Sequence, residues 1–200
     1  MNNTVNLFFA CDDGYIPFLA VTITSIKEHR NPCREYILRV LNTGISDEHK
    51  TRIKASLECD GFKIEFPDIS CEVERISEKL HTRDYYSKTT YYRLFIPELY
   101  PEIDKALYLD CDIVLRSDVA ELYDVDLKDN LVGAISDSFV TCVPRLHDYV
   151  TERVGVRRPI DYFNAGVLLM NLKEMREALF GDRFVELIDK ITFDVAQDQD

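Results

Sequence analysis

Apolar and polar residues form alternating blocks along the first third of the chain. Val5–Cys11 is an apolar run that stops at Asp12-Asp13-Gly14, as a buried strand does. Apolar residues then recur at helical spacing, at Ile16, Leu19, Ile23 and Ile26. This pattern predicts a strand followed by a helix that runs to about Arg30.

The same order of elements repeats in the next segment. A second strand is expected at Ile37–Leu41, and Ser46 is a suitable N-cap for a helix that runs to about Glu58. A third strand is expected at Phe62–Phe66. Strands that alternate with helices over short connections predict a parallel sheet covered by helices, which is an α/β fold.

The second half of the chain is less regular. Residues 71–96 are mostly helical in pattern, and further strands are expected at Ala106–Leu109, Leu131–Ser136 and Asn164–Asn171. A helix from Lys173 is expected to break at Gly181, before a last helix that contains Phe184 and Ile191. Ser138–Pro159 is irregular and polar, so we expect a mobile or inserted segment there.

The run Leu107–Leu115 carries the strongest chemical signal. Its apolar residues stop at Asp110, and Asp112 follows one residue later. On a strand, two such carboxylates point to the same side, roughly 6–7 Å apart at the backbone. A divalent cation between them relieves their repulsion, and carboxylate oxygens suit Mg²⁺ or Mn²⁺. The alternative is a surface turn in which both aspartates face water.

Other acidic and amide side chains also fall at predicted strand ends. These are Asp12, Asp13, Asp137 and Asn164. Each alone is an ordinary turn former, but ligands of open parallel sheets bind beyond the carboxyl ends of the strands. No Gly-x-Gly-x-x-Gly or P-loop motif accompanies them, so phosphate binding would rely on the metal and on Arg93.

Composition narrows the class of protein. Two hundred residues with 46% hydrophobic content suffice for one core, and a net charge of −12 argues against a nucleic acid as partner. The six cysteines form no Cys-x-x-Cys pair, so neither a zinc site nor a disulfide framework is indicated. The sequence has no signal-peptide pattern and no apolar stretch of membrane-spanning length. We therefore expect a cytoplasmic protein with reduced thiols.

Five segments resemble the successive motifs of glycosyltransferase family 8. They are Phe9–Tyr15, Thr90–Pro97, Lys105–Leu115, Phe163–Leu172 and Gln197–Asp200. The family includes bacterial lipopolysaccharide galactosyl- and glucosyltransferases and is related to glycogenin. The resemblance implies a GT-A fold, with a Rossmann-like, open and mostly parallel sheet flanked by helices. It also implies retaining, metal-dependent transfer of glucose or galactose from a UDP-sugar to a saccharide acceptor, in lipopolysaccharide or cell-surface glycan synthesis.

The resemblance also implies roles for individual residues. The uracil and ribose would be held by Ala10, Asp12 and Tyr15. The cofactor, Mn²⁺ or Mg²⁺, would be bound by Asp110 and Asp112, with Asp110 also reaching the nucleotide through the metal. The donor sugar would be surrounded by Arg93, Asp137, Asn164, Ala165, Asp198 and Gln199, of which Arg93, Asp137, Asp198 and Gln199 form the implied catalytic group.

Retention requires either a nucleophile below the sugar or attack from the face that the diphosphate leaves. Gln199 is an uncharged amide and a poor nucleophile, whereas Asp200 is chemically better. We favour same-face attack, in which the diphosphate assists the acceptor hydroxyl and the Gln199 carbonyl stabilises positive charge on the sugar.

In the family a histidine, the usual third metal ligand, and a tail would follow Asp200. We therefore expect residues 1–200 to be a single nucleotide-sugar-binding catalytic domain that is truncated at its C-terminus. The missing tail would be the means of association with the inner face of the membrane.

Two other functions fit parts of the pattern. Leu109–Val114 also resembles the first motif of haloacid-dehalogenase-type phosphatases, in which the first aspartate, here Asp110, is phosphorylated. That motif normally lies near the start of a chain, and the other four segments have no role in it. The third interpretation is a non-catalytic nucleotide-sugar binder.

Overall fold

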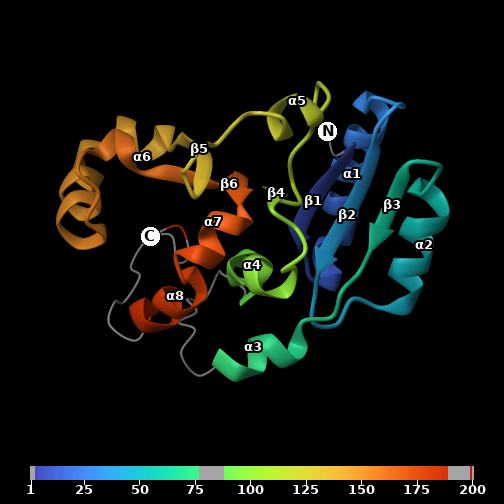
Figure 1. Cartoon of the computed structure of the whole chain (residues 1–200), viewed down its shortest axis with the longest axis horizontal. Coiled ribbons are helices and arrows are strands. Elements are labelled where there is room, and N and C mark those ends of the chain that lie inside the picture. Colours follow the sequence, from blue (N-terminus) through green and yellow to red (C-terminus); the bar gives the residue numbers. More distant parts are fainter. Residues whose placement is uncertain (1–2, 77–87, 189–198, 200) are drawn as a thin grey trace.

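A six-stranded sheet lies at the centre of the fold. The computed structural model describes residues 3–76, 88–188 and 199. Its strand order is β3-β2-β1-β4-β6-β5 (Figure 1). The strands are β1 (Thr4–Ala10), β2 (Glu35–Leu41), β3 (Phe62–Glu65), β4 (Lys105–Leu109), β5 (Val132–Ser136) and β6 (Phe163–Asn171). The first four strands pair in parallel, whereas β6 is antiparallel to both β4 and β5. The prediction of a mostly parallel α/β sheet is therefore confirmed.

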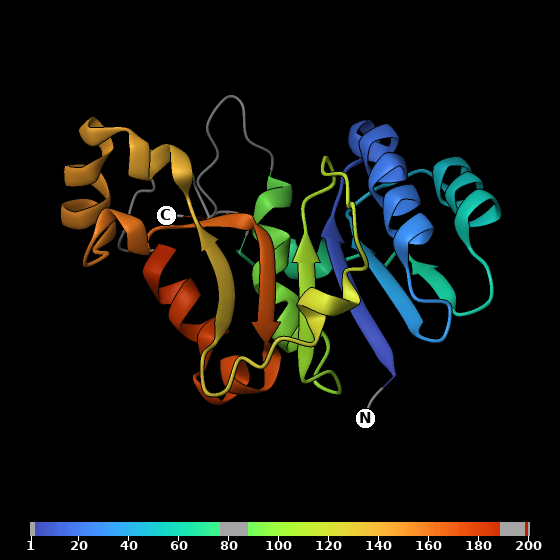
Figure 2. The same ribbon diagram turned by 90° about the horizontal axis from the view of Figure 1, so that it is seen from above.

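Helices cover both faces of this sheet. The α-helices are α1 (Ile16–His29), α2 (Asp47–Leu57), α3 (Ser70–Ile76), α4 (Ile96–Leu99), α5 (Ala120–Tyr123), α6 (Ser138–Cys142), α7 (Leu172–Glu177) and α8 (Phe180–Ile188). Shorter or non-α turns are η1 (Asp13–Tyr15), η2 (Lys88–Phe95), η3 (Pro144–Leu146), η4 (Tyr149–Val154) and η5 (Pro159–Asp161). Figure 2 shows α1 and α2 over the β1–β3 end of the sheet. No described helix has the length and hydropathy of a membrane-spanning segment.

The continuous apolar run Leu7–Ala10 of β1 follows from burial on both sides. Leu7 and Phe9 pack in one core layer with Leu19 of α1, while Phe8 packs in the opposite layer with Ile96 of α4. A strand with two buried faces has no polar face, and its sequence therefore does not alternate. The predicted bounds of the first three strands and two helices agree with the structure to within about two residues.

Ser46 caps α2 as the sequence predicted. Its side-chain oxygen accepts a hydrogen bond from the backbone N–H of His49 at 3.4 Å. Asp47 and Glu48 occupy the first turn, where negative charge is favoured by the helix dipole.

The predicted helix break at Gly181 is wrong. The chain turns between α7 and α8 at Leu179, which has a left-handed φ of 53°, and Gly181 lies inside α8. Gly181 N donates to the Glu98 carboxylate of α4 at 3.2 Å, and a Cβ at Gly181 would collide with that carboxylate. The glycine therefore allows a close contact with α4 and does not end a helix. Ile191, expected in the last helix, is outside the described residues.

The segment expected to be irregular is mostly helical. Between β5 and β6 the chain forms α6, η3, η4 and η5, and these short helices surround a small apolar cluster of their own. The buried members of this cluster are Val140, Val150 and Tyr162. We call residues 138–162 the helical lobe; it lies at the opposite end of the molecule from β3 (Figure 1). In the earlier segment predicted as helical, 71–96, residues 77–87 are outside the described part.

Because of Tyr36, the stability of the folded state is expected to fall as the pH rises in the alkaline range. Its ring is fully buried, and its hydroxyl donates to Asp118 at 2.8 Å and accepts from Asn31 N at 3.0 Å. Burial and then the Asp118 hydrogen bond raise the pKa of Tyr36 to about 12. The unfolded chain releases this proton near pH 10, so between pH 10 and 12 the folded state should lose up to about 2.7 kcal/mol of stability.

We expect Tyr36→Phe to remove this dependence. At pH 7 the variant should be less stable by about 1–2 kcal/mol, because the hydrogen bonds are lost. As the pH rises above 10 the difference should shrink, since phenylalanine does not titrate. Urea denaturation from pH 8 to 12 measures the free energy of unfolding of both proteins. A difference between them that stays constant over this range contradicts the raised pKa of Tyr36.

Candidate functional site

Strand direction brings the predicted polar residues to one edge of the sheet. Because β1, β4 and β5 run the same way, their carboxyl ends share an edge, and Asp12, Asp110 and Asp137 follow these three strands. Asn164 stands at the start of β6, which is antiparallel and therefore begins at this same edge. Here Asp110 N donates to Gly166 O at 2.8 Å, so the β4 and β6 segments meet at the site.

A polar cavity of about 440 Å³ opens at this edge. It is lined by Ala10, Cys11, Asp12, Tyr15, Thr89, Thr90, Arg93, Tyr108, Asp110, Cys111 and Asp112. The structure thus brings together the residues that the resemblance assigned to the uracil, the ribose and the metal, whereas Asn164 and Ala165 do not line this cavity. Asp13 does not line it: its carboxylate accepts from Ser46 N at 2.9 Å and contacts the His49 ring at 2.8 Å. These two contacts, in that order, lower the pKa of Asp13.

The aspartate pair lies in a turn and not on a strand, which corrects the geometry expected from the sequence. β4 ends at Leu109, and Asp110–Asp112 follow it. Cys111 between them is buried, whereas Asp112 is exposed and the Asp110 side chain is 41% exposed. Both aspartates line the polar cavity, and so does Cys111.

Two cysteines fix this turn to the end of β1. The Cys111 thiol donates to Ala10 O at 3.1 Å, and the Cys11 thiol donates to Asp12 O at 3.2 Å. The neighbouring Cys11 thiol, followed by burial, raises the pKa of the Cys111 thiol. Both cysteines are free thiols, and they act here as buried, uncharged packing groups.

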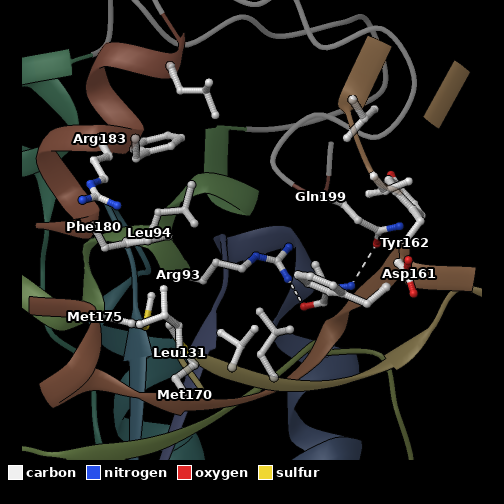
Figure 3. A pocket seen from close by; sticks show the side chains of 18 residues that line it. Arg93, Leu94, Leu131, Asp161, Tyr162, Met170, Met175, Phe180, Arg183 and Gln199 are labelled. Carbon is white, nitrogen blue, oxygen red and sulfur yellow. Dashed lines mark hydrogen bonds between the residues drawn. The ribbon is translucent and has the colours of Figure 1, made fainter. Parts of the chain in front are cut away.

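Arg93 is a buried cation beside the aspartate pair. Only 5% of the residue is exposed, and its Nη1 lies 3.7 Å from Asp110 Oδ1. Nη1 also donates to Ala165 O (Figure 3), and Nε donates to Thr90 O at 2.9 Å. The guanidinium carbon lies 4.5 Å from the centre of the Tyr108 ring, whose hydroxyl donates to Asp110 Oδ1 at 3.3 Å. These contacts hold Arg93 in one orientation.

Gln199 connects two other predicted residues. Its Oε1 accepts from Ala165 N at 2.9 Å, and its Nε2 donates to Asp137 Oδ2 at 3.0 Å. Asp137 also caps α6 by accepting from Phe139 N and Val140 N. Burial raises the pKa of Asp137, but the hydrogen bonds from Val140 N, Gln199 and Phe139 N outweigh it, so its pKa is lowered. Asp137 is therefore ionised at neutral pH. Asp198 lies outside the described residues.

A second cavity, mostly apolar and about 450 Å³ in volume, lies on the other side of Arg93. Arg93, Ala165 and Gln199 line it together with side chains of β5, β6, α7, α8 and the segment between β5 and β6, which contributes Val154, Val156, Asp161 and Tyr162 (Figure 3). Arg93 therefore lies between the polar cavity and the apolar cavity and lines both.

The carboxylates of Asp110 and Asp112 are the donors available for a metal ion. Within the described ranges, no group of three His, Cys, Asp or Glu side chains converges on a common point. Two carboxylates suit Mg²⁺ or Mn²⁺, which accept water and phosphate oxygens at their remaining positions.

Sequence reasoning missed two contacts at this site. Tyr108 supports both Arg93 and Asp110. It stands two residues before Asp110, and the period of a strand would have placed it on the same side. Gly166, whose backbone lies against Asp110, is the other.

Comparison with known proteins decides the family. Residues 6–200 match the model of glycosyl transferase family 8. The chain belongs to this family. It is 31% identical over 176 residues to a putative glycosyltransferase of Haemophilus influenzae, a match that covers 88% of this chain and 51% of that protein. It is 26% identical to General stress protein A of Bacillus subtilis, with 98% and 67% covered.

Solved structures show the same fold. The galactosyltransferase LgtC, in complex with donor and acceptor sugar analogs, is 33% identical with a TM-score of 0.79, and the match covers 98% of this chain and 68% of LgtC. The apo bifunctional glycosyltransferase WbbM is 29% identical with a TM-score of 0.79, over 94% and 34%. The predicted GT-A fold is confirmed. The chain spans about half to two-thirds of the length of the curated relatives named above.

Proposed function

We propose that this family 8 chain is the nucleotide-sugar-binding and catalytic domain of a retaining hexosyltransferase. It transfers glucose or galactose from a UDP-sugar to a saccharide acceptor of a cell-surface glycan, and it requires Mn²⁺ or Mg²⁺. The observation that carries this proposal is the convergence of Asp12, Arg93, Asp110 and Asp112 on one polar cavity. Nucleotide, diphosphate and cation all require polar groups of this kind.

The nucleoside would lie against the end of β1. Asp12 Oδ1 accepts from Tyr15 N at 3.1 Å, which fixes its carboxylate at the rim of the cavity, where ribose hydroxyls would donate to it. The Tyr15 ring is 47% exposed and lines the same cavity, so it offers an apolar surface to a base. Ala10 also lines the cavity, and its small side chain leaves space for the nucleoside.

The diphosphate would lie in the polar cavity beside the aspartate turn and Arg93, which both line it. Asp110 and Asp112 would hold the divalent ion, which acts as a Lewis acid on the leaving diphosphate. Arg93 supplies a second positive charge, already desolvated and oriented by Thr90 O and Ala165 O. A fixed charge in a water-poor site stabilises developing negative charge without reorganisation.

The stereochemical part of the proposal rests on Gln199 and Asp137. Gln199 is uncharged, and its Oε1 already accepts a hydrogen bond from Ala165 N, so it is a weak nucleophile. Asp137 is ionised, but hydrogen bonds occupy both of its oxygens. These contacts support same-face attack, with Gln199 and Asn164 beside the sugar; Asp198 is added to this group by the resemblance to the family alone. A solved active-site glutamine-to-glutamate variant of LgtC, 32% identical to this chain, also supports an active-site glutamine.

Thermal denaturation with added ligands tests the proposal. UDP together with Mn²⁺ should raise the melting temperature, because a ligand at about 100 times its dissociation constant adds roughly 2.7 kcal/mol to the stability of the folded state. UDP alone, or Mn²⁺ with inorganic phosphate, should have a much smaller effect. A shift with phosphate esters but none with UDP and Mn²⁺ contradicts the proposal and favours a phosphatase.

A further inference from the structure

Gly166 lies in β6 directly against the carboxylate of Asp110. Asp110 N donates to Gly166 O at 2.8 Å, and Gly166 N donates to Asn164 Oδ1 at 2.9 Å. A Cβ built on Gly166 would lie 2.5 Å from Asp110 Oδ2 and 3.0 Å from Asn164 Oδ1. Distances this short between a side chain and Cβ force one of the groups to move.

The backbone conformation at residue 166 does not require a glycine. Gly166 is absent from the glycines with positive φ, which are Gly61 and Gly155 in the described residues. A glycine inside a strand reduces stability, and the next residues of β6 are bulky and apolar, from Val167 to Met170. The remaining physical reason is the close approach of the Asp110 side chain.

The opposite side of the Asp110 carboxylate is also occupied. Its Oδ1 accepts from Tyr108 at 3.3 Å and lies 3.7 Å from Arg93 Nη1. The carboxylate is therefore held between Arg93 and Tyr108 on one side and the bare backbone of Gly166 on the other. A side chain at residue 166 would push it toward the cation or into the cavity.

We propose that Gly166 is a positioning residue for Asp110 and, through its N–H, for Asn164. Its missing side chain sets where the Asp110 carboxylate stands at the end of β4. The consequence for metal and nucleotide binding rests on the proposed function, whereas the steric relation between Gly166 and Asp110 does not.

A thermodynamic cycle tests the steric relation without any ligand. Gly166→Ala should lower the melting temperature of the native sequence. In an Asp110→Ala background the same change should leave the melting temperature unchanged or raise it, because the main collision is gone and alanine restricts the unfolded chain. Equal losses in both backgrounds overturn the proposal. If Gly166→Ala does not fold, a folded double variant supports the proposal and an unfolded one overturns it.

Ligand binding gives the second measurement. Calorimetry with UDP and Mn²⁺ should show at least about a 10-fold loss of affinity in Gly166→Ala. Gly44→Ala is the matched control, because a Cβ at Gly44 meets nothing within 4 Å, and it should bind as the native protein does. Native-like binding by Gly166→Ala overturns the positioning role and leaves the proposed function intact. Absence of UDP binding in the native protein contradicts the proposed function, and the thermodynamic cycle then decides the role of Gly166.

Discussion

Replacing Asp112 by asparagine should abolish Mn²⁺-dependent binding of UDP and reduce hexose transfer by at least about 100-fold. The exposed Asp112 carboxylate lines the polar cavity beside Asp110, so it is available to a cation. An amide of the same shape keeps one oxygen but loses the charge that attracts a divalent ion. The fold should remain intact, because the substitution removes a negative charge from a turn that already carries another.

Calorimetric titration with Mn²⁺ in the presence of UDP measures this loss, and a transfer assay follows activity. Asp129→Asn is the matched control, since Asp129 is exposed and precedes β5, at the edge of the sheet opposite the cavity. It makes the same chemical change and should alter neither binding nor transfer. Unchanged Mn²⁺ affinity in Asp112→Asn would mean that the aspartate pair is a solvated turn.

Arg93→Lys should also reduce transfer by at least about 100-fold, although it preserves the charge. One ammonium group lacks the planar fork with which Arg93 reaches Ala165 O, Thr90 O and Asp110. It also loses the stacking on Tyr108. Because the site is buried, the free energy of unfolding should fall by about 2–4 kcal/mol as well.

Arg176→Lys separates the two effects of the Arg93 substitution. Arg176 of α7 likewise donates to several backbone carbonyls, those of Pro97, Tyr100 and Ile103, but it does not line either cavity of the site. Its replacement should lower stability and leave the rate of transfer per folded molecule unchanged. Chemical denaturation and initial rates on both variants make the comparison. Equal rates for Arg93→Lys and the native protein would remove Arg93 from the mechanism.

The part of the fold that the sequence predicted is the part set by local signals. The burial of β1 on both faces appears as an apolar run, and the cap of α2 appears as Ser46 before two acidic residues. The gathering of Asp12, Asp110 and Asp137 at one edge could be inferred because carboxyl ends of parallel strands coincide. Each of these features is indicated by a short stretch of sequence, since each aspartate comes at the end of its own predicted strand.

Features that depend on distant contacts were not predictable in this way. Nothing local to Phe163–Asn171 shows that β6 runs against β4, and only that reversal brings Asn164 to the site. The role of Gly181 depends on Glu98, which is 83 residues away. The spacing of Asp110 and Asp112 predicts a strand, but the pairing of β4 with β6 ends at Leu109.

The helical lobe leaves the sheet just after Asp137 and returns just before Asn164. Both of its attachment points therefore stand at the rim of the site, while its interior is closed by its own cluster around Val140 and Tyr162. The lobe also faces the rest of the molecule, because its Val154 and Val156 line the apolar cavity beside Arg93. A displacement of the helical lobe would therefore shift Asp137 and Asn164 together, while Asp12 and Asp110, which follow β1 and β4, would keep their places.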